Sequence, residues 1–207
     1  MRKLKTIEMR RLSLEQFREA PKLPLVVVLD DVRSLYNVGS VFRSCDAFRV
    51  EAVYLCGITA CPPHAEIHKT ALGGEDSVAW RYFAHADDAV HELHRRGYHV
   101  YSIEQVEGST KLQQLGESLR AQSSSSLEGT CGQEEAQSPS FAGVRGQAVV
   151  FGNEVKGVHQ SVVDLCDGCL EIPQFGTKHS LNVSVTAGIV VWEFARHLLL
   201  DKDTPQP

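Results

Sequence analysis

Residues 25–43 read LVVVLDDVRSLYNVGSVFR, and this stretch decides the fold class. Its first part, Leu25–Asp30, is a run of aliphatic residues without polar alternation, which is typical of a strand buried on both faces of a sheet. A polar turn follows, and a helical stretch then occupies about Val38–Phe48. A buried strand that leads through a loop into a helix is the basic unit of α/β folds with a parallel sheet.

The same alternation continues along the chain. We expect further strands at Ala52–Cys56, Val78–Phe83, Tyr98–Ile103, Gln147–Phe151 and Gly168–Ile172. We expect further helices at Asp87–Arg96, Val158–Leu165 and Leu181–Leu200, the last of them apolar on most faces and therefore largely buried. The sequence thus predicts an α/β fold, a mainly parallel sheet with helices on both faces.

Length and composition suit one folded domain with short additions. The 207 residues are 43% hydrophobic and 23% charged, as expected for a globular chain. We assign residues 25–200 to the domain, 1–24 to a basic N-terminal extension and 201–207 to a C-terminal tail. Residues 121–146 are rich in Ser, Gly, Gln and Glu, which indicates a flexible surface insertion. The sequence shows neither an apolar run of about 18 uncharged residues nor a secretory signal, so we expect a cytoplasmic protein without a membrane partner.

Charge is distributed unevenly. Of the net −5, residues 1–24 carry +4 from seven Lys and Arg against three Glu, and the remainder of the chain therefore carries −9. A basic arm on an acidic body suits the binding of phosphates. A solvated amphipathic helix is an equally good interpretation of the same residues.

The six cysteines include Cys166 and Cys169, which form a C-x-x-C. A zinc site normally has a second ligand pair at a matching spacing, and the sequence offers none. We therefore expect free thiols and no metal ion.

Ligands of an open α/β sheet bind beyond the carboxyl ends of the strands, so the loops there are candidate sites. The first such loop leads into a helix that Asn37 is suited to cap. Gly39 permits close approach of a backbone or a ligand, and Arg43 lies among apolar neighbours. The alternative interpretation is an ordinary capped helix whose arginine pairs with a carboxylate.

Two later loops are also unusual. Residues 151–158 hold Gly152 and Gly157 around a polar turn, whose N–H groups can cradle a polar ligand. An ordinary connection between a strand and a helix is the alternative, and the Walker phosphate loop is absent from the sequence. Residues 172–185 join the last strand to the C-terminal helix, which Ser180 or Asn182 can cap.

Together the three loops resemble one family, the SpoU-type (TrmH-like) RNA 2′-O-ribose methyltransferases of the SPOUT superfamily. The matching motifs are N-x-G-x-x-x-R at Asn37, Gly39 and Arg43, G-x-E-x-x-G at Gly152, Glu154 and Gly157, and I-P followed by S-L-N-V-S-V at Ile172–Pro173 and 180–185. The motifs occur in the family's order over about residues 25–200, and 69–73 (KTALG) resembles a subgroup signature. The sequence departs from many relatives at Gln174, where they have methionine.

The resemblance implies a deep trefoil knot in the C-terminal part of the fold, S-adenosyl-L-methionine as the cofactor, RNA (tRNA or rRNA) as the substrate, and a homodimer. By analogy, the cofactor pocket comprises Ile103, Phe151, Gly152, Asn153, Glu154, Gly157, Ile172 and Leu181. The implied catalytic residues are Arg43, Asn37, Glu154, Ser180 and Asn182. Arg43 is expected to meet the RNA, with Asn37 orienting Arg43 or the ribose and Glu154 anchoring the loop or Arg43. The alternative function is an RNA-binding protein with the same fold and no transfer activity.

Overall fold

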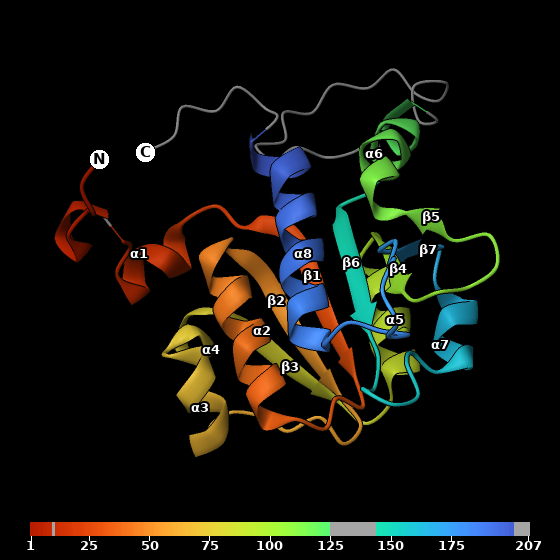
Figure 1. Ribbon diagram of the computed structural model, residues 1–207, viewed down its shortest axis with the longest axis horizontal. Helices are drawn as coiled ribbons and strands as arrows, with labels where there is room; N and C mark the ends of the chain where they lie inside the picture. Colours follow the sequence, from red (N-terminus) through yellow and green to blue (C-terminus); the bar gives the residue numbers. More distant parts are fainter. Residues whose placement is uncertain (10, 125–143, 201–207) are drawn as a thin grey trace.

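A single parallel sheet forms the centre of the protein (Figure 1). The computed structural model describes residues 1–9, 11–124 and 144–200. The strands are β1 (Leu23–Asp30), β2 (Val50–Cys56), β3 (Ala79–Phe83), β4 (Tyr98–Ile103), β5 (Thr110–Lys111), β6 (Gly146–Phe151) and β7 (Gly168–Glu171). They form a seven-stranded sheet in the order β3-β2-β1-β6-β4-β7-β5, and each neighbouring pair is parallel. The predicted mainly parallel α/β sheet is confirmed.

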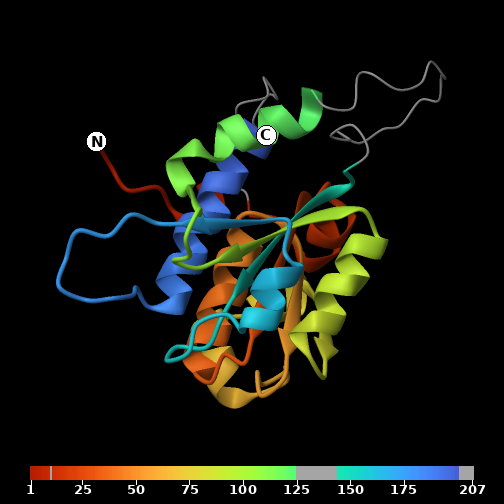
Figure 2. The ribbon, with the colours of Figure 1, turned by 90° about the vertical axis from the view of Figure 1, so that its right-hand side faces the viewer.

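Helices cover both faces of the sheet, as predicted (Figure 2). The principal helices are α2 (Leu35–Ala47), α5 (Ala86–Arg95), α6 (Leu115–Ser124), α7 (Gln160–Leu165) and α8 (Val183–Ala195). Helices α2, α6 and α8 share one hydrophobic core, and α5 and α7 share the other. The interior strand β1 contributes to both cores, with Leu25, Val27 and Leu29 on one face and Val26 and Val28 on the other, all 0% exposed. Two buried faces explain why this strand lacks polar alternation.

The predicted N-terminal extension is shorter than expected. Ser13 caps the helix α1 (Leu14–Glu19) with a full capping box, and a 3₁₀ turn, η1, spans Thr6–Met9. Phe17 is 5% exposed and belongs to the same core as α2 and α8, so α1 is part of the domain. Strand β1 begins at Leu23, two residues before the predicted start.

The predicted insertion is also shorter. Helix α6 follows a 3₁₀ turn, η2 (Leu112–Gln114), and extends to Ser124, and β6 begins at Gly146. Both ends of the segment 121–146 are therefore regular structure. Residues 125–143 and the predicted tail 201–207 lie outside the described part of the chain.

The sequence analysis missed α6 and also two shorter helices, α3 (Ala65–Ala71) and α4 (Gly74–Ser77). The KTALG segment forms the end of α3 and the left-handed turn after it. Gly39 lies where α2 crosses α3, and a Cβ there would come within 2.2 Å of Ile67 O and of Thr70 Oγ1. Close packing of two helices therefore requires this glycine, rather than the approach of a ligand.

The C-terminal helix is only partly buried, contrary to our expectation. Helix α8 continues into a turn of π-helix, η3 (Arg196–Leu200), and one face packs on the sheet through residues such as Val190 and Phe194. The opposite face exposes Val185 (52%), Ile189 (39%) and Trp192 (46%). Val183–Leu200 is long and apolar enough to span a bilayer by length and composition alone, with 33% of it buried inside the protein.

Gly39→Ala should lower the free energy of unfolding by roughly 1–3 kcal/mol, because the added methyl group forces α2 and α3 apart. The matched control is Gly188→Ala in α8, another helix of 13 residues, where the nearest atom to an added Cβ is Ser44 Oγ at 3.8 Å. The control should be neutral or stabilising by up to about 1 kcal/mol. Urea unfolding of the three proteins measures both effects, and equal stabilities would contradict the packing role of Gly39.

Candidate active site

A cavity of about 640 Å³ opens at the carboxyl ends of β4, β6 and β7. Its lining comprises residues 103–106, the loop 151–158, Gln160, Val163, Glu171, Ile172, Gln174, residues 179–183 and Thr186. The eight positions predicted for the cofactor pocket all line it: Ile103, Phe151, Gly152, Asn153, Glu154, Gly157, Ile172 and Leu181. The structure therefore brings together segments that are far apart in sequence, at the edge of the sheet where a ligand is expected.

The loop 151–158 is a tight turn that depends on its two glycines. Asn153 and Gly157 exchange backbone hydrogen bonds of 3.0 and 2.9 Å. A Cβ on Gly152 would lie 2.0 Å from the carbonyl carbon of Gly157, and Gly157 itself has φ of 71°. The side chain of Asn153 closes the turn by accepting from the amides of Val155 and Lys156.

Glu154 joins this loop to the start of α2. Its carboxylate accepts hydrogen bonds from Arg33 N, Ser34 N and Asn37 Nδ2, each 3.0 Å long. The amides at a helix N-terminus have no partner within the helix and favour a negative charge. Partial burial acts to raise the pKa of Glu154, but the hydrogen bonds from Arg33, Ser34 and Asn37 outweigh it and hold the pKa below its usual value.

A chain of side-chain amides continues from Glu154 to the last helix. Asn37 Oδ1 accepts from Asn182 Nδ2 at 3.1 Å. Asn182 is the N-cap of α8, as predicted, and its Oδ1 accepts from Ser184 N at 2.9 Å. The contacts Glu154–Asn37–Asn182 thus connect all three motifs.

Asn37 does not cap α2, contrary to our prediction. Ser34 is the N-cap, and its hydroxyl accepts from Asn37 N at 3.3 Å. The helix begins earlier than expected, and Asn37 lies inside its first turn. The side chain of Asn37 is thereby free to point to Glu154 and Asn182.

Arg43 does not join this cluster. Six residues of α-helix advance about 9 Å along the axis and turn about 600°, which places Arg43 roughly 120° around α2 from Asn37. The Arg43 side chain is exposed, does not line the cavity, and among the described residues has no hydrogen bond or ion pair. Of the two alternatives given for Glu154, the structure shows contacts that anchor the loop, and within one chain neither Glu154 nor Asn37 contacts Arg43.

Ser180 and Leu181 lie at the rim of the cavity, on an exposed segment. Gln105 Nε2 donates to His179 O at 3.0 Å and connects this segment to the end of β4. Ile103 and Ile172 are half-buried on the same cavity wall. The cavity therefore combines an apolar wall with polar groups at its mouth.

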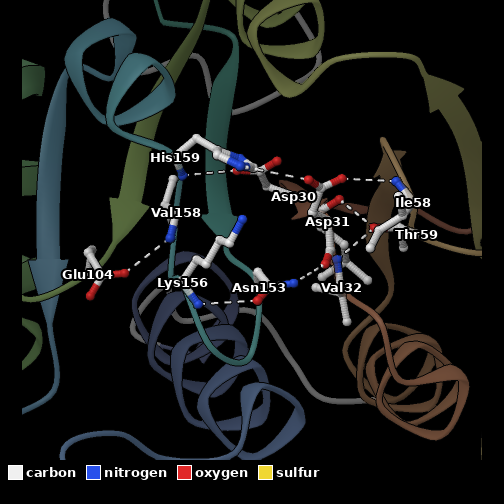
Figure 3. A network of polar contacts seen from close by, with 11 residues as sticks. Asp30, Asp31, Val32, Ile58, Thr59, Glu104, Asn153, Lys156, Val158 and His159 are labelled. Atoms are coloured by element: carbon white, nitrogen blue, oxygen red, sulfur yellow. Dashed lines mark hydrogen bonds and ion pairs between the residues drawn. The ribbon is translucent and has the colours of Figure 1, made fainter.

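The sequence analysis missed a polar network behind the loop 151–158 (Figure 3). Glu104 Oε2 accepts from Val158 N at 3.1 Å, Asp31 O accepts from Asn153 Nδ2 at 2.8 Å, and Asp30 contacts His159. Asp30, Asp31 and His159 also place one potential metal-ligand atom each within 4.8 Å of one another. The sequence feature that could have indicated this network is the pair of adjacent aspartates, Asp30 and Asp31, at the end of a buried strand.

The C-x-x-C pair lies elsewhere, around the start of β7. The pKa of Cys166 is raised to about 12, mainly by burial of the thiol and secondly by the negative charge of the nearby Asp167. A thiol with this pKa stays protonated at neutral pH and is a poor nucleophile and metal ligand.

Comparison with known proteins agrees with this geometry. Residues 24–192 match the SpoU rRNA Methylase family. The tRNA (guanosine(18)-2′-O)-methyltransferase of Thermus thermophilus is 28% identical over 192 residues, covering 93% of this chain and 84% of that protein. The 23S rRNA (guanosine-2′-O-)-methyltransferase RlmB of Nitrosomonas europaea is 30% identical over 187 residues, covering 89% and 62%.

Solved structures show the same fold. The TrmH/SpoU tRNA modifying enzyme of A. aeolicus superposes with a TM-score of 0.67 at 22% identity, covering 93% of this chain and 84% of that one. An AdoMet-bound rRNA methyltransferase from Sinorhizobium meliloti has a TM-score of 0.66 at 23% identity, covering 88% and 60%. The chain thus spans about three fifths of the length of these rRNA relatives.

These findings define the class as the SpoU-type RNA 2′-O-ribose methyltransferases. The chain belongs to the SpoU rRNA Methylase family, and the resemblance drawn from its three motifs is confirmed.

Glu154→Gln should remove a pH-dependent part of the stability. A carboxyl group whose pKa is lowered on folding stabilises the protein above its unfolded pKa, and this stabilisation is lost as pH falls through the folded pKa. Wild type should therefore exceed Glu154→Gln in unfolding free energy above pH 4.5, the ordinary pKa, and the difference should shrink below it. Urea unfolding at several pH values measures the stability difference between the two proteins. A difference independent of pH would contradict the lowered pKa of Glu154.

Proposed function

We propose that this protein transfers a methyl group from S-adenosyl-L-methionine to a ribose 2′-hydroxyl of structured RNA, either tRNA or rRNA. The observation that carries the proposal is the Glu154–Asn37–Asn182 chain at the mouth of the cavity, which unites the three family motifs. The names of the relatives support the reaction type.

The cavity fits the proposed cofactor. Its volume of about 640 Å³ lies in the usual range for a cofactor or drug-sized ligand. An adenine ring can lie between Ile103, Ile172 and Leu181. Because Gly152 has no side chain, the loop backbone can turn tightly at the edge of the cavity. When bound, S-adenosyl-L-methionine supplies an activated methyl group on its sulfonium.

The residues of the chain bind and align the RNA. Arg43 donates hydrogen bonds to the phosphate of the target nucleotide or to the developing alkoxide, because a guanidinium group has N–H donors and no acceptor. The hydroxyl proton leaves through that phosphate or through water. Ser180 offers a hydroxyl at the cavity mouth, whereas Asn37, Glu154 and Asn182 hold the loops in place.

We also propose a homodimer formed through the exposed face of α8. Val185, Ile189 and Trp192 follow one another at helical spacing, and the Trp192 ring packs against Phe48 in a tilted arrangement with ring centroids 5.7 Å apart. A contiguous apolar stripe of this kind suits a self-complementary interface. Arg43, which lies outside its own cavity, then meets the cavity of the partner subunit.

The trefoil knot is part of the same proposal. Strand β7 lies beyond β4 in the sheet, and the chain returns from it to α8, which packs against α2. On its way it contacts the segment that follows β4, through Gln105 and His179. A knot made by threading this return segment past the loop after β4 is consistent with these contacts.

Wild type should transfer radiolabelled methyl groups from S-adenosyl-L-methionine to RNA isolated from cells that lack the gene, at a 2′-hydroxyl. Arg43→Ala should transfer at least 100-fold more slowly, on the scale of losing one stabilising donor, and should bind the cofactor normally. RNA binding without transfer by wild type would favour the non-catalytic alternative. Transfer by Arg43→Ala at the wild-type rate would exclude the role given to Arg43.

Light scattering at micromolar concentration should show wild type as two copies of the 22.9 kDa chain. Trp192→Glu should shift the mass toward one copy, because a charge in the apolar interface has no partner. The control is Tyr82→Glu, which also replaces an exposed aromatic residue, 52% exposed on β3. A monomeric wild type would contradict the dimer.

Mixed dimers test whether the site is shared. If Arg43 serves the partner's cavity, dimers of Arg43→Ala with Asn182→Ala retain one intact site and regain activity. If Arg43 serves its own cavity, both sites of the mixed dimer are defective and activity stays at background.

Removing residues 1–12 should weaken RNA binding and leave cofactor affinity unchanged. This segment holds Arg2, Lys3, Lys5, Arg10 and Arg11, and the truncation keeps Ser13 and Phe17 and so preserves α1. For every phosphate that the arm no longer neutralises, the log–log salt slope should fall by about 0.9 unit or less. Equal affinity and slope for both proteins would show that the arm does not contact RNA.

A further inference from the structure

Asp30 and His159 form a pair at the C-terminal end of the loop 151–158, which lines the cavity proposed for the cofactor (Figure 3). Asp30 Oδ2 accepts from the backbone amide of His159 at 3.1 Å and contacts its ring Nδ1 at 2.8 Å. The carboxylate oxygen accepts in both contacts, so the ring nitrogen is the donor. One oxygen therefore holds both the backbone and the side chain of the residue that follows the loop.

The neighbouring Asp31 holds the entrance of the same loop. Its backbone has φ of 54°, in the left-handed region, and its carbonyl oxygen accepts from Asn153 Nδ2 at 2.8 Å. Asp31 Oδ1 accepts from Ile58 N at 2.9 Å, and a Cβ on Gly57 would lie 1.9 Å from that oxygen. The second carboxylate oxygen, Oδ2, lies 3.7 Å from His159 Nε2.

These contacts lie behind the cavity. Asp30, Asp31 and His159 do not line it, whereas the loop residues that they hold do. The side chain of Asp30 is 4% exposed and that of His159 is 43% exposed. His159 thus contributes little to the core, and its removal should loosen the loop while the domain stays folded.

The geometry points to Asp30 and His159 as positioning residues for the cofactor: the pair fixes the exit of the loop 151–158 and so keeps the Gly152–Gly157 turn in its binding shape. This inference rests on the proposed function. It assigns a role to two residues outside the three family motifs, acting through the loop rather than by touching the ligand.

The chain offers a matched control. His94 Nε2 lies 3.0 Å from Asp167 Oδ2, and that oxygen also accepts a backbone hydrogen bond, from Val100 N at 2.7 Å. This second pair also joins a histidine ring nitrogen to an aspartate oxygen, although its aspartate is 36% exposed, and His94 does not line the cavity. His94→Ala should therefore leave cofactor binding unchanged.

The test uses the full chain with His159→Ala, His159→Asn and His94→Ala. Calorimetry should show that His159→Ala binds S-adenosyl-L-methionine about tenfold more weakly than wild type, the order expected for one hydrogen bond to a charged group. His159→Asn should recover to within about threefold, because an asparagine Nδ2 takes nearly the place of histidine Nδ1. RNA affinity measured without cofactor should be the same for all four proteins.

A second measurement needs no cofactor. Hydrogen exchange of the segment 151–159 should be faster in His159→Ala than in wild type and unchanged in His94→Ala. If wild type binds the cofactor and His159→Ala binds it equally well, the inference is wrong. If wild type does not bind the cofactor, the proposed function fails, and unchanged exchange in His159→Ala would then also overturn the positioning role.

Discussion

The rest of the site depends on the hydrogen bonds that the carboxylate of Glu154 accepts at the N-terminus of α2. The first amides of a helix need acceptors, and here the acceptor comes from a loop 120 residues further along the chain. β6 pairs with β1 in parallel register, so the loop after β6 necessarily emerges beside the helix that follows β1. One carboxylate thus binds the two backbone amides just before α2 and joins the loop 151–158 to this helix, and Asn37 extends the connection to Asn182 and α8.

The same constraint holds together predicted site residues from all three motifs. Hydrogen bonds of these motif side chains join Asn37, Glu154 and Asn182 to one another and to backbone amides at helix ends. Their placement at the mouth of a cavity makes them indispensable for the geometry of that cavity. The groups left free to meet a substrate are different ones, such as the exposed Ser180 and the unpaired guanidinium of Arg43 in the described part of the chain.

Most strands and the motif loops could be predicted from the sequence, including the short β3 and β7, whereas β5 and the helices α3, α4 and α6 could not. β1, β2, β4 and β6 were found because buried parallel strands read as aliphatic runs. α3 was missed because only Ile67 and Ala71 of its seven residues are buried, which leaves no apolar periodicity. β5 has two residues and carries no pattern at all. In the site, the lining residues came from motif resemblance, whereas the Asp30–His159 contact depends on a separation of 129 residues that only the fold reveals.

Helix α8 shows a deeper limit of sequence patterns. An apolar residue that packs on the sheet and one that packs on another subunit look the same in a sequence, so a helix apolar on most faces reads as buried. The structure separates the two faces: Val190 and Phe194 belong to the core, and Val185, Ile189 and Trp192 remain exposed. Arg43 has the complementary property, a cation exposed on α2 with no partner among the described residues of its own chain. In the part of the chain that the structure describes, the apolar face of α8 is uncovered and Arg43 on the neighbouring α2 has no partner. One explanation accounts for both features if a single monomer carries only part of the site.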